Sequence, residues 1–143
     1  KIVGEVDFEK EAELLMNQGQ YEMAYIKLLR DPKLDKEGNL YQQLHTIQGL
    51  NKQISYYSSA ASLHNREEAL NALIVGMTKY DNNKKTAKNL SISKEYNDVY
   101  KQIAQLLKSE FDLTVKEARE LSYINSNKEY SERIVTICAE SKK

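Results

Sequence analysis

Residues 8–29 read FEKEAELLMNQGQYEMAYIKLL, and this stretch decides the fold class. In its first half, Phe8, Ala12 and Leu15 recur at i, i+4 and i+7, which is the spacing of one face of an α-helix. Gly19 follows and suits the left-handed position that ends a helix. The second half carries a longer apolar stripe at helical spacing, made of Tyr21, Ala24, Tyr25, Leu28 and Leu29. The stretch therefore predicts two short helices joined by a tight turn.

The rest of the chain repeats this pattern of apolar stripes separated by short polar breaks. One proline and five glycines are too few for the frequent turns of a sheet protein. Pro32 closes the second stripe, because the residue before a proline avoids helical geometry. Each segment has one apolar face and is too short to be stable alone in water, so neighbours must pack together. We therefore expect an all-α fold of about seven antiparallel helices.

Breaks in the stripes predict where the later helices begin and end. A long third helix is expected over residues 39–63, with Gly49 marking a bend or a close helix contact. A fourth helix is expected to end at residues 81–83, before a loose basic connector that runs to Leu90. A turn is expected at residues 109–112, between the fifth and sixth helices.

Polar residues ahead of four stripes suit the N-terminal caps of helices. Ser91 is expected to cap the fifth helix. Three matches to the capping box, in which an Asn, Thr or Ser precedes a Glu by three residues, stand before the fourth, sixth and seventh stripes. These matches pair Asn65 with Glu68, Thr114 with Glu117, and Ser126 with Glu129.

The segment from Phe8 to Leu29 resembles one tetratricopeptide repeat (TPR). The family pattern has a large aromatic and then a small residue in its first helix, a Gly-x-Tyr turn, and a small residue in its second helix. Those positions fall here on Phe8, Ala12, Gly19, Tyr21 and Ala24.

Residues 50–83 look like a second, degenerate repeat. His64 and Arg66 replace the Gly and Tyr of the turn, and Gln53 stands where the large aromatic residue belongs. The resemblance implies a right-handed α-solenoid of helical hairpins, with one TPR-like domain over residues 1–143. It also implies that the first helices of the hairpins line a concave groove for a peptide. The residues that would face this groove are Glu9, Glu13, Asn17, Asn51, Ile54, Ser58 and Ser62.

Composition argues against several classes of partner. Lys plus Arg and Asp plus Glu both number 21, so the net charge is zero, whereas a dedicated nucleic-acid binder or a polybasic membrane anchor needs a basic surface. No run of about 18 apolar residues occurs, so no membrane insertion is expected within this segment. The chain begins at Lys1 rather than Met, and we expect it to be part of a longer protein.

The sequence contains no recognisable catalytic, metal-binding or cofactor-binding motif. His45 and His64 are the only histidines, and neither has a second ligand at metal-binding spacing. Cys138 is the only cysteine, which excludes a cysteine-based zinc site, and its apolar neighbours predict a buried thiol. No phosphate-binding loop or nucleophile elbow is present. We expect no catalytic site, metal or cofactor.

Two compositional features leave alternatives open. Five lysines lie in and around the connector expected after the fourth helix, namely Lys79, Lys84, Lys85, Lys88 and Lys94. They suit either a solvated connector or a contact with an acidic partner. The chain also has ten tyrosines. Five fall on the stripes and are assigned to packing, namely Tyr21, Tyr57, Tyr80, Tyr96 and Tyr130. Four lie off or beside the stripes and are candidate contacts for a partner, namely Tyr41, Tyr56, Tyr100 and Tyr123.

Three functions remain in view. The first is a protein–protein interaction or scaffolding module of a bacterial protein, which binds a protein or peptide on its helical surface. The second is a structural spacer, or the extracytoplasmic domain of a membrane-anchored protein, with no ligand of its own. The third is an enzyme or small-ligand binder, which needs polar residues converging in the core, and the stripes offer almost none. The sequence leaves the compartment and the oligomeric state open.

Overall fold

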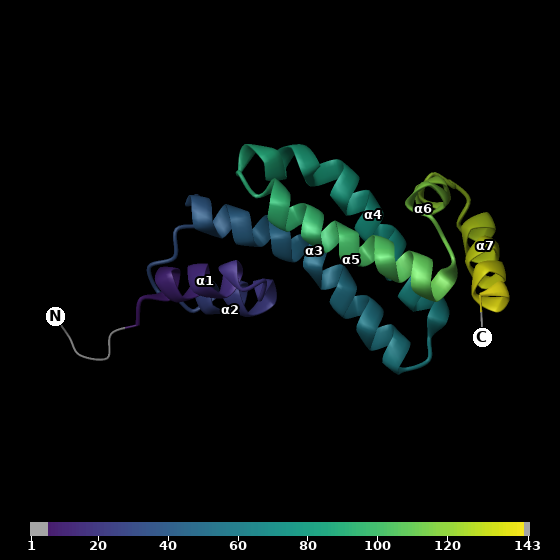
Figure 1. Cartoon of the computed structure of the whole chain (residues 1–143), viewed down its shortest axis with the longest axis horizontal. Coiled ribbons are helices and arrows are strands. Elements are labelled where there is room, and N and C mark those ends of the chain that lie inside the picture. The colour runs from purple at the N-terminus through teal and green to yellow at the C-terminus, as the bar shows by residue number, and fades with distance from the viewer. Residues whose placement is uncertain (1–5, 142–143) are drawn as a thin grey trace.

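The computed structural model describes residues 6–141, and over that range it contains seven α-helices and no strand (Figure 1). The all-α prediction is therefore confirmed. The helices are α1 (Phe8–Asn17), α2 (Tyr21–Leu29), α3 (Asn39–Ser62), α4 (Arg66–Asn89), α5 (Ser93–Phe111), α6 (Val115–Ser122) and α7 (Asn127–Glu140).

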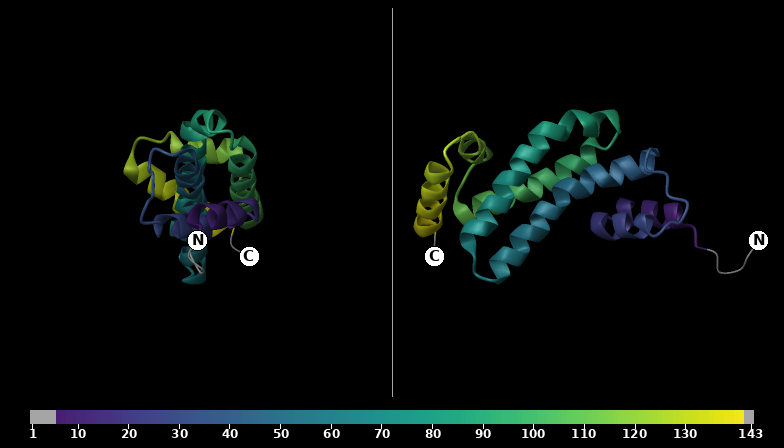
Figure 2. Two further views of the ribbon diagram at one scale, coloured as in Figure 1. Left: turned by 90° about the vertical axis from the view of Figure 1, so that its left-hand side faces the viewer. Right: turned by 180° about the vertical axis from the view of Figure 1, so that it is seen from behind.

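Three long helices form the centre of the molecule, and two pairs of shorter helices flank it (Figures 1 and 2). Helices α3 and α4 pack along much of their length, and α5 lies against both. At one end, α1 and α2 pack on each other and α2 lies on α3. At the other end, α6 and α7 each contact α4 much more than they contact each other.

A single glycine allows the central helices to approach closely. A Cβ atom at Gly76 of α4 would lie 2.8 Å from Cδ1 of Ile103 in α5 and 3.5 Å from Cβ of Gln53 in α3. The close contact considered for Gly49 is absent, because a Cβ atom there would meet nothing within 4 Å. The apolar stripes converge around Gly76, where Ile47, Leu73, Met77 and Ile103 are fully buried.

Aromatic side chains join the α1–α2 hairpin to α3. The Tyr25 hydroxyl lies 2.9 Å from Nδ1 of His45, and the rings of Tyr41 and His45 stack with centroids 5.4 Å apart. Burial, followed by the hydrogen bond with Tyr41, raises the pKa of Tyr25 to about 12. Within the hairpin, Ala12 and Ala24 are completely buried, and this lets α1 and α2 pack closely.

Four inter-helix turns contain a residue in the left-handed backbone conformation. One of them is glycine, as predicted, and the other three carry side chains that make this conformation less favourable. At His64 the chain closes a Schellman-type turn, in which the Asn65 N–H donates to the Ala60 carbonyl at 2.9 Å. The four residues are Gly19 (φ 76°), His64 (φ 59°), Ser91 (φ 61°) and Asp112 (φ 51°).

The predicted end of the fourth helix at residues 81–83 is wrong, as is the loose connector that follows it. Helix α4 continues to Asn89. The side chain of Asn83 donates to the Lys79 carbonyl at 3.0 Å inside the helix, so it does not terminate the helix. Ala87, only 1% exposed, holds the last turns against the core.

Two further predictions, the cap of α5 and the turn that follows this helix, also change. Ser91 does not cap α5, because it takes the left-handed conformation that ends α4, and Ile92 occupies the N-cap position instead. The turn expected at residues 109–112 begins only at Asp112, because Phe111 is buried and extends α5.

At each of the three predicted capping boxes, the first residue caps the helix that follows it. Thr114 and Glu117 form the complete, reciprocal box at the start of α6. Asn65 and Ser126 accept backbone N–H bonds of 3.2 Å from Glu68 and Glu129, respectively, at the starts of α4 and α7.

The tyrosines divide largely as the stripes predicted. The five assigned to packing are buried or half-buried. Of the four candidate contacts, Tyr41 and Tyr100 are half-buried in ring stacks, whereas Tyr56 and Tyr123 are exposed.

Candidate partner-binding cleft

The seven residues predicted to face a groove lie on α1 and α3. On α1, Glu9, Glu13 and Asn17 are exposed and recur every four residues along one face. On α3, Ser58 and Ser62 are exposed, whereas Asn51 and Ile54 are half-buried. The Asn51 amide donates to the Gln48 side chain at 3.1 Å. Whether these residues form one binding surface stays a prediction.

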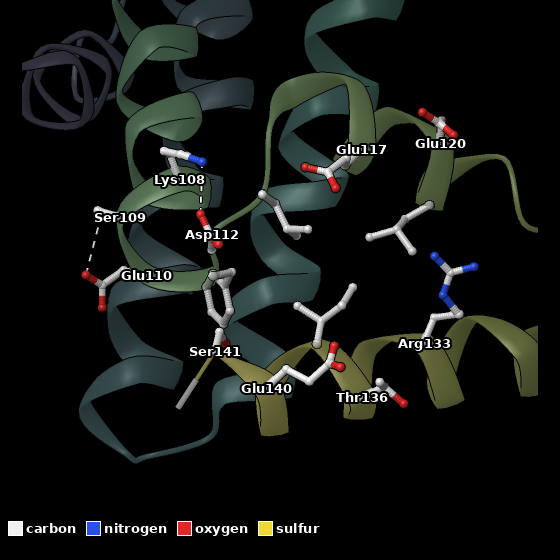
Figure 3. A pocket seen from close by; sticks show the side chains of 14 residues that line it. Lys108, Ser109, Glu110, Asp112, Glu117, Glu120, Arg133, Thr136, Glu140 and Ser141 are labelled. Atoms are coloured by element: carbon white, nitrogen blue, oxygen red, sulfur yellow. Dashed lines mark hydrogen bonds and ion pairs between the residues drawn. The ribbon is translucent and has the colours of Figure 1, made fainter. Parts of the chain in front are cut away.

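A cleft of about 750 Å³ lies elsewhere, where the C-terminal end of α5 faces α6 and α7 (Figure 3). Its floor is apolar and consists of Phe111, Leu113, Leu121 and Ile137. The first three are almost fully buried, and Ile137 is half-buried. The cleft therefore offers a partner a concave shape and a small exposed apolar area, and not a large apolar surface.

The cleft exists because α6 and α7 are held on α4 and not on each other. Helix α6 is tied to α4 by Arg119, whose Nε and Nη2 donate to the two carboxylate oxygens of Asp81 at 2.7 and 3.1 Å. Helix α7 is tied to α4 by Tyr130, whose hydroxyl donates to Oδ1 of Asn71 at 2.7 Å. The two helices are thus positioned independently, and a gap remains between their facing sides.

Arg66 connects the helix ends that surround the cleft. Its Nη2 donates to the Glu110 carbonyl of α5 and to Oγ of Ser141, just after α7, both at 2.9 Å. Its guanidinium carbon lies 4.7 Å from the centroid of the Phe111 ring, close enough for a cation–π interaction. The end of α5 and the end of α7 are therefore fixed to the start of α4.

The lining of the cleft is acidic, although the chain as a whole has no net charge. Its charged lining comprises five carboxylates and two basic groups, a formal net charge of −3. Lys108 pairs with Asp112 at 2.9 Å. Glu117 accepts bonds from the backbone N–H and the hydroxyl of Thr114 at 2.9 and 3.1 Å, and these bonds lower the pKa of Glu117.

Two carboxylates without an ion pair remain on the rim, those of Glu120 and Glu140, whereas the Glu110 carboxylate is directed away from the cleft toward Ser109 (Figure 3). Among residues 6–141, neither Glu120 nor Glu140 lies within 4.0 Å of a basic group. Glu120 lies in the last turn of α6 and Glu140 is the last residue of α7, where the helix dipole disfavours negative charge. Violations of such local rules concentrate at functional sites, so the rim is a candidate binding site for a cation.

The rim carboxylates are not arranged for a metal. Over the described part of the chain, no group of three His, Cys, Asp or Glu side chains is placed to hold a metal ion. The two rim acids come from different helices, Glu120 from α6 and Glu140 from α7. This spread suits an extended ligand that carries several positive charges.

Sequence reasoning missed this cleft. Its rim acids stand at positions 120 and 140, too far apart in the chain to form a motif. Glutamate in the last turn of a helix was the one local pattern that could have drawn attention to them.

The remaining predicted features are structural. Cys138 is buried, as predicted, and burial raises the pKa of its thiol. His45 is exposed and bonded to Tyr25, and His64 is exposed in its turn. No helix within residues 6–141 has the length and apolar content needed to cross a membrane. Comparisons of the chain with protein-family models, curated proteins and solved structures found no match. The TPR resemblance and the role of the cleft therefore rest on the residues and geometry of this chain alone.

Proposed function

We propose that this chain is a helical scaffold that binds a protein or peptide partner. Its cleft between α5, α6 and α7 would hold a segment of the partner that is rich in lysine or arginine. The observation that carries the proposal is the pair of rim carboxylates, Glu120 and Glu140, which make no ion pair within 4.0 Å among the described residues, in a lining whose net charge is negative. A cationic segment would supply ion-pair partners for these two carboxylates.

The energetics favour a weak, reversible complex. Ion pairs exposed to solvent each contribute about 0.2–1 kcal/mol. The small apolar floor adds one modest contact through Ile137, the half-buried member of that floor. Binding should therefore weaken strongly with salt, because exposed pairs are screened. Such affinity suits a scaffold that gathers partners transiently.

The TPR resemblance belongs to the same proposal, with α1–α2 and α3–α4 as successive hairpins of a right-handed solenoid. Two features support it. Gly19 and His64, at corresponding turn positions, share the left-handed conformation. Ala24 and Ala69, at the corresponding small positions of the second helices, are both buried. On this view, the groove predicted along α1 and α3 is a second surface for a partner.

A peptide panel tests the proposal. Fluorescence anisotropy would compare labelled peptides of matched length that are lysine-rich, neutral or acidic. We expect the lysine-rich peptides to bind best. Replacing Glu120 and Glu140 with lysine should weaken their binding about tenfold, through the loss of two exposed pairs.

A matched control carries the same change of charge on the other surface, with Glu9 and Glu13 replaced by lysine. Both control residues are exposed on α1. Equal loss in both variants would show nonspecific attraction to net charge. Loss only in the α1 variant would move the site to the predicted groove. No binding by any peptide would contradict the proposal and leave the spacer role.

A further inference from the structure

A second charged feature lies at the other end of α5. We call it the lysine knob, and it consists of Lys84, Lys85 and Lys88 on the last turns of α4. All three are exposed, and none makes an ion pair within the described residues. Lys84 and Lys88 are four residues apart and Lys85 and Lys88 three apart, so they share one face of the helix.

The knob has no acidic side chain in its local sequence. Residues 82–94 contain four lysines and no Asp or Glu. The fourth, Lys94, pairs with Asp98 at 3.1 Å. The small depression beside the knob, about 280 Å³, is lined by lysines, tyrosines and small or polar residues without a carboxylate. The knob therefore presents three positive charges that make no ion pair among the described residues.

One chain cannot bring its own knob to its own cleft. Figure 1 shows that the turn from α4 to α5 and the end of α5 nearest α6 and α7 lie at opposite ends of α5. The knob lies at the first of these ends, and the residues that line the cleft lie at the second. Helix α5 has 19 residues, so it is about 28 Å long and holds the two features apart. Any contact between them must join two molecules.

We propose that the lysine knob of one chain docks in the acidic cleft of a second copy. This inference rests on the proposed function, since it names the partner of the same cleft. The charges are complementary, since three lysines would meet a cleft of net negative charge that includes Glu120 and Glu140, and both features are exposed in the single chain. The contact is heterologous, so each bound copy presents a free knob or a free cleft and the assembly grows head to tail.

Sedimentation velocity of the 143-residue chain tests the docking. At about 50 mM salt we expect larger species to increase with protein concentration, and at about 500 mM salt we expect the chain to be monomeric, because screening shortens to a few ångströms. Two variants sharpen the test. The knob variant carries Lys84→Glu, Lys85→Glu and Lys88→Glu, and the cleft variant carries Glu120→Lys and Glu140→Lys.

Each variant alone should be monomeric at low salt, because its knob and cleft then carry the same sign. An equimolar mixture should associate again, because each knob then meets a cleft of opposite charge. As a control, Lys10, Lys33 and Lys36 are replaced with glutamate; these exposed lysines lie on α1 and in the α2–α3 connector, and their loss should leave association unchanged.

Failure of this inference is distinct from failure of the proposed function. A wild-type chain that is monomeric at low salt, or variants that do not reassociate on mixing, would overturn docking between copies. If lysine-rich peptides still bind through Glu120 and Glu140, the cleft remains a binding site for a different partner. If circular dichroism shows that a variant has lost its helices, single reversals of Lys88 and Glu140 repeat the mixing test.

Discussion

The short helices at the two ends of the molecule are packed in different ways. At the N-terminal end, α1 and α2 bury Ala12 and Ala24 completely and form a closed hairpin. At the C-terminal end, Ala118 of α6 and Ile134 of α7 are just as well buried, but both helices rest on α4. Two short helices that pack on a common third helix leave their facing sides free, and the acidic cleft occupies that space.

The difference also concerns charge. The α1–α2 hairpin neutralises a charge internally, since Lys27 pairs with Glu11 at 3.2 Å across the two helices. The α6–α7 end leaves Glu120 and Glu140 without such a partner in residues 6–141. The closed hairpin thus pairs a charge across its two helices, whereas the open pair leaves two carboxylates without an ion pair. Four predictions probe this contrast.

The largest effect is expected from truncating the contact between the closed hairpin and the centre. Leu28 is 1% exposed on the face of α2 that packs inward. We expect Leu28→Ala to lower the free energy of unfolding by about 3 kcal/mol, since it leaves a cavity in a filled core. Ile137→Ala, on the half-buried floor of the cleft, should cost about 1 kcal/mol. Urea unfolding followed by circular dichroism measures both, and equal losses would contradict the contrast between filled and open ends.

An enlarged side chain tests the same contrast from the other direction. Ala12→Leu has no free space between α1 and α2, so we expect it to cost about 2 kcal/mol through overpacking. Thr136 lines the cleft from α7 and is exposed. Thr136→Leu should change the free energy of unfolding by less than about 0.5 kcal/mol. A comparable penalty at both positions, measured by urea unfolding, would mean that the cleft is closed in solution.

Tyr130 probes how α7 is attached to α4. Losing its 2.7 Å bond to Asn71 in Tyr130→Phe should cost about 1 kcal/mol at neutral pH. Burial raises the pKa of Tyr130 to about 12, from an ordinary value of 10.0. Below pH 10 the hydroxyl is neutral in both states. Between pH 10 and 12 only the unfolded chain loses the proton, so the free energy of unfolding falls as the pH rises.

Tyr130→Phe removes this contribution, so its unfolding free energy should fall less steeply between pH 10 and 12. Urea titrations at stepped pH values provide the measurement. A variant with the same alkaline slope as the wild type would show that Tyr130 is not buried against α4.

The smallest effect on stability is expected at Lys108, which pairs with Asp112 on the rim of the cleft. Because both side chains are well exposed, Lys108→Ala should leave the urea midpoint unchanged within error. It should nevertheless raise the affinity of a lysine-rich peptide about twofold, because one repelling charge is removed. Anisotropy titrations would detect this, and weaker binding would argue against an acidic site.

The closed end was predictable from sequence because its determinants are local. The stripes of α1 and α2 and the turn at Gly19 all lie within residues 8–29. The continuation of α4 beyond residue 83 was missed because the burial of Ala87 against the core outweighs the turn preference of Asn82 and Asn83.

The cleft was not predictable, because it depends on how three helices are placed around α4. No local sequence pattern predicts that Arg119 will bind Asp81, 38 positions earlier, or that Arg66 will donate a hydrogen bond to Ser141. The sequence predicted the lysines of the knob as a basic patch in a loose connector. In the structure these lysines lie on one face of helix α4.

The most direct test of the account is to map the binding surface by NMR. Backbone amide shifts of the isotope-labelled chain would be followed while the best lysine-rich peptide of the panel is added. We predict that the shifts concentrate at residues 108–121 and 133–141, around the acidic cleft. Shifts confined to α1 and the exposed face of α3, or spread evenly over the chain, would contradict it.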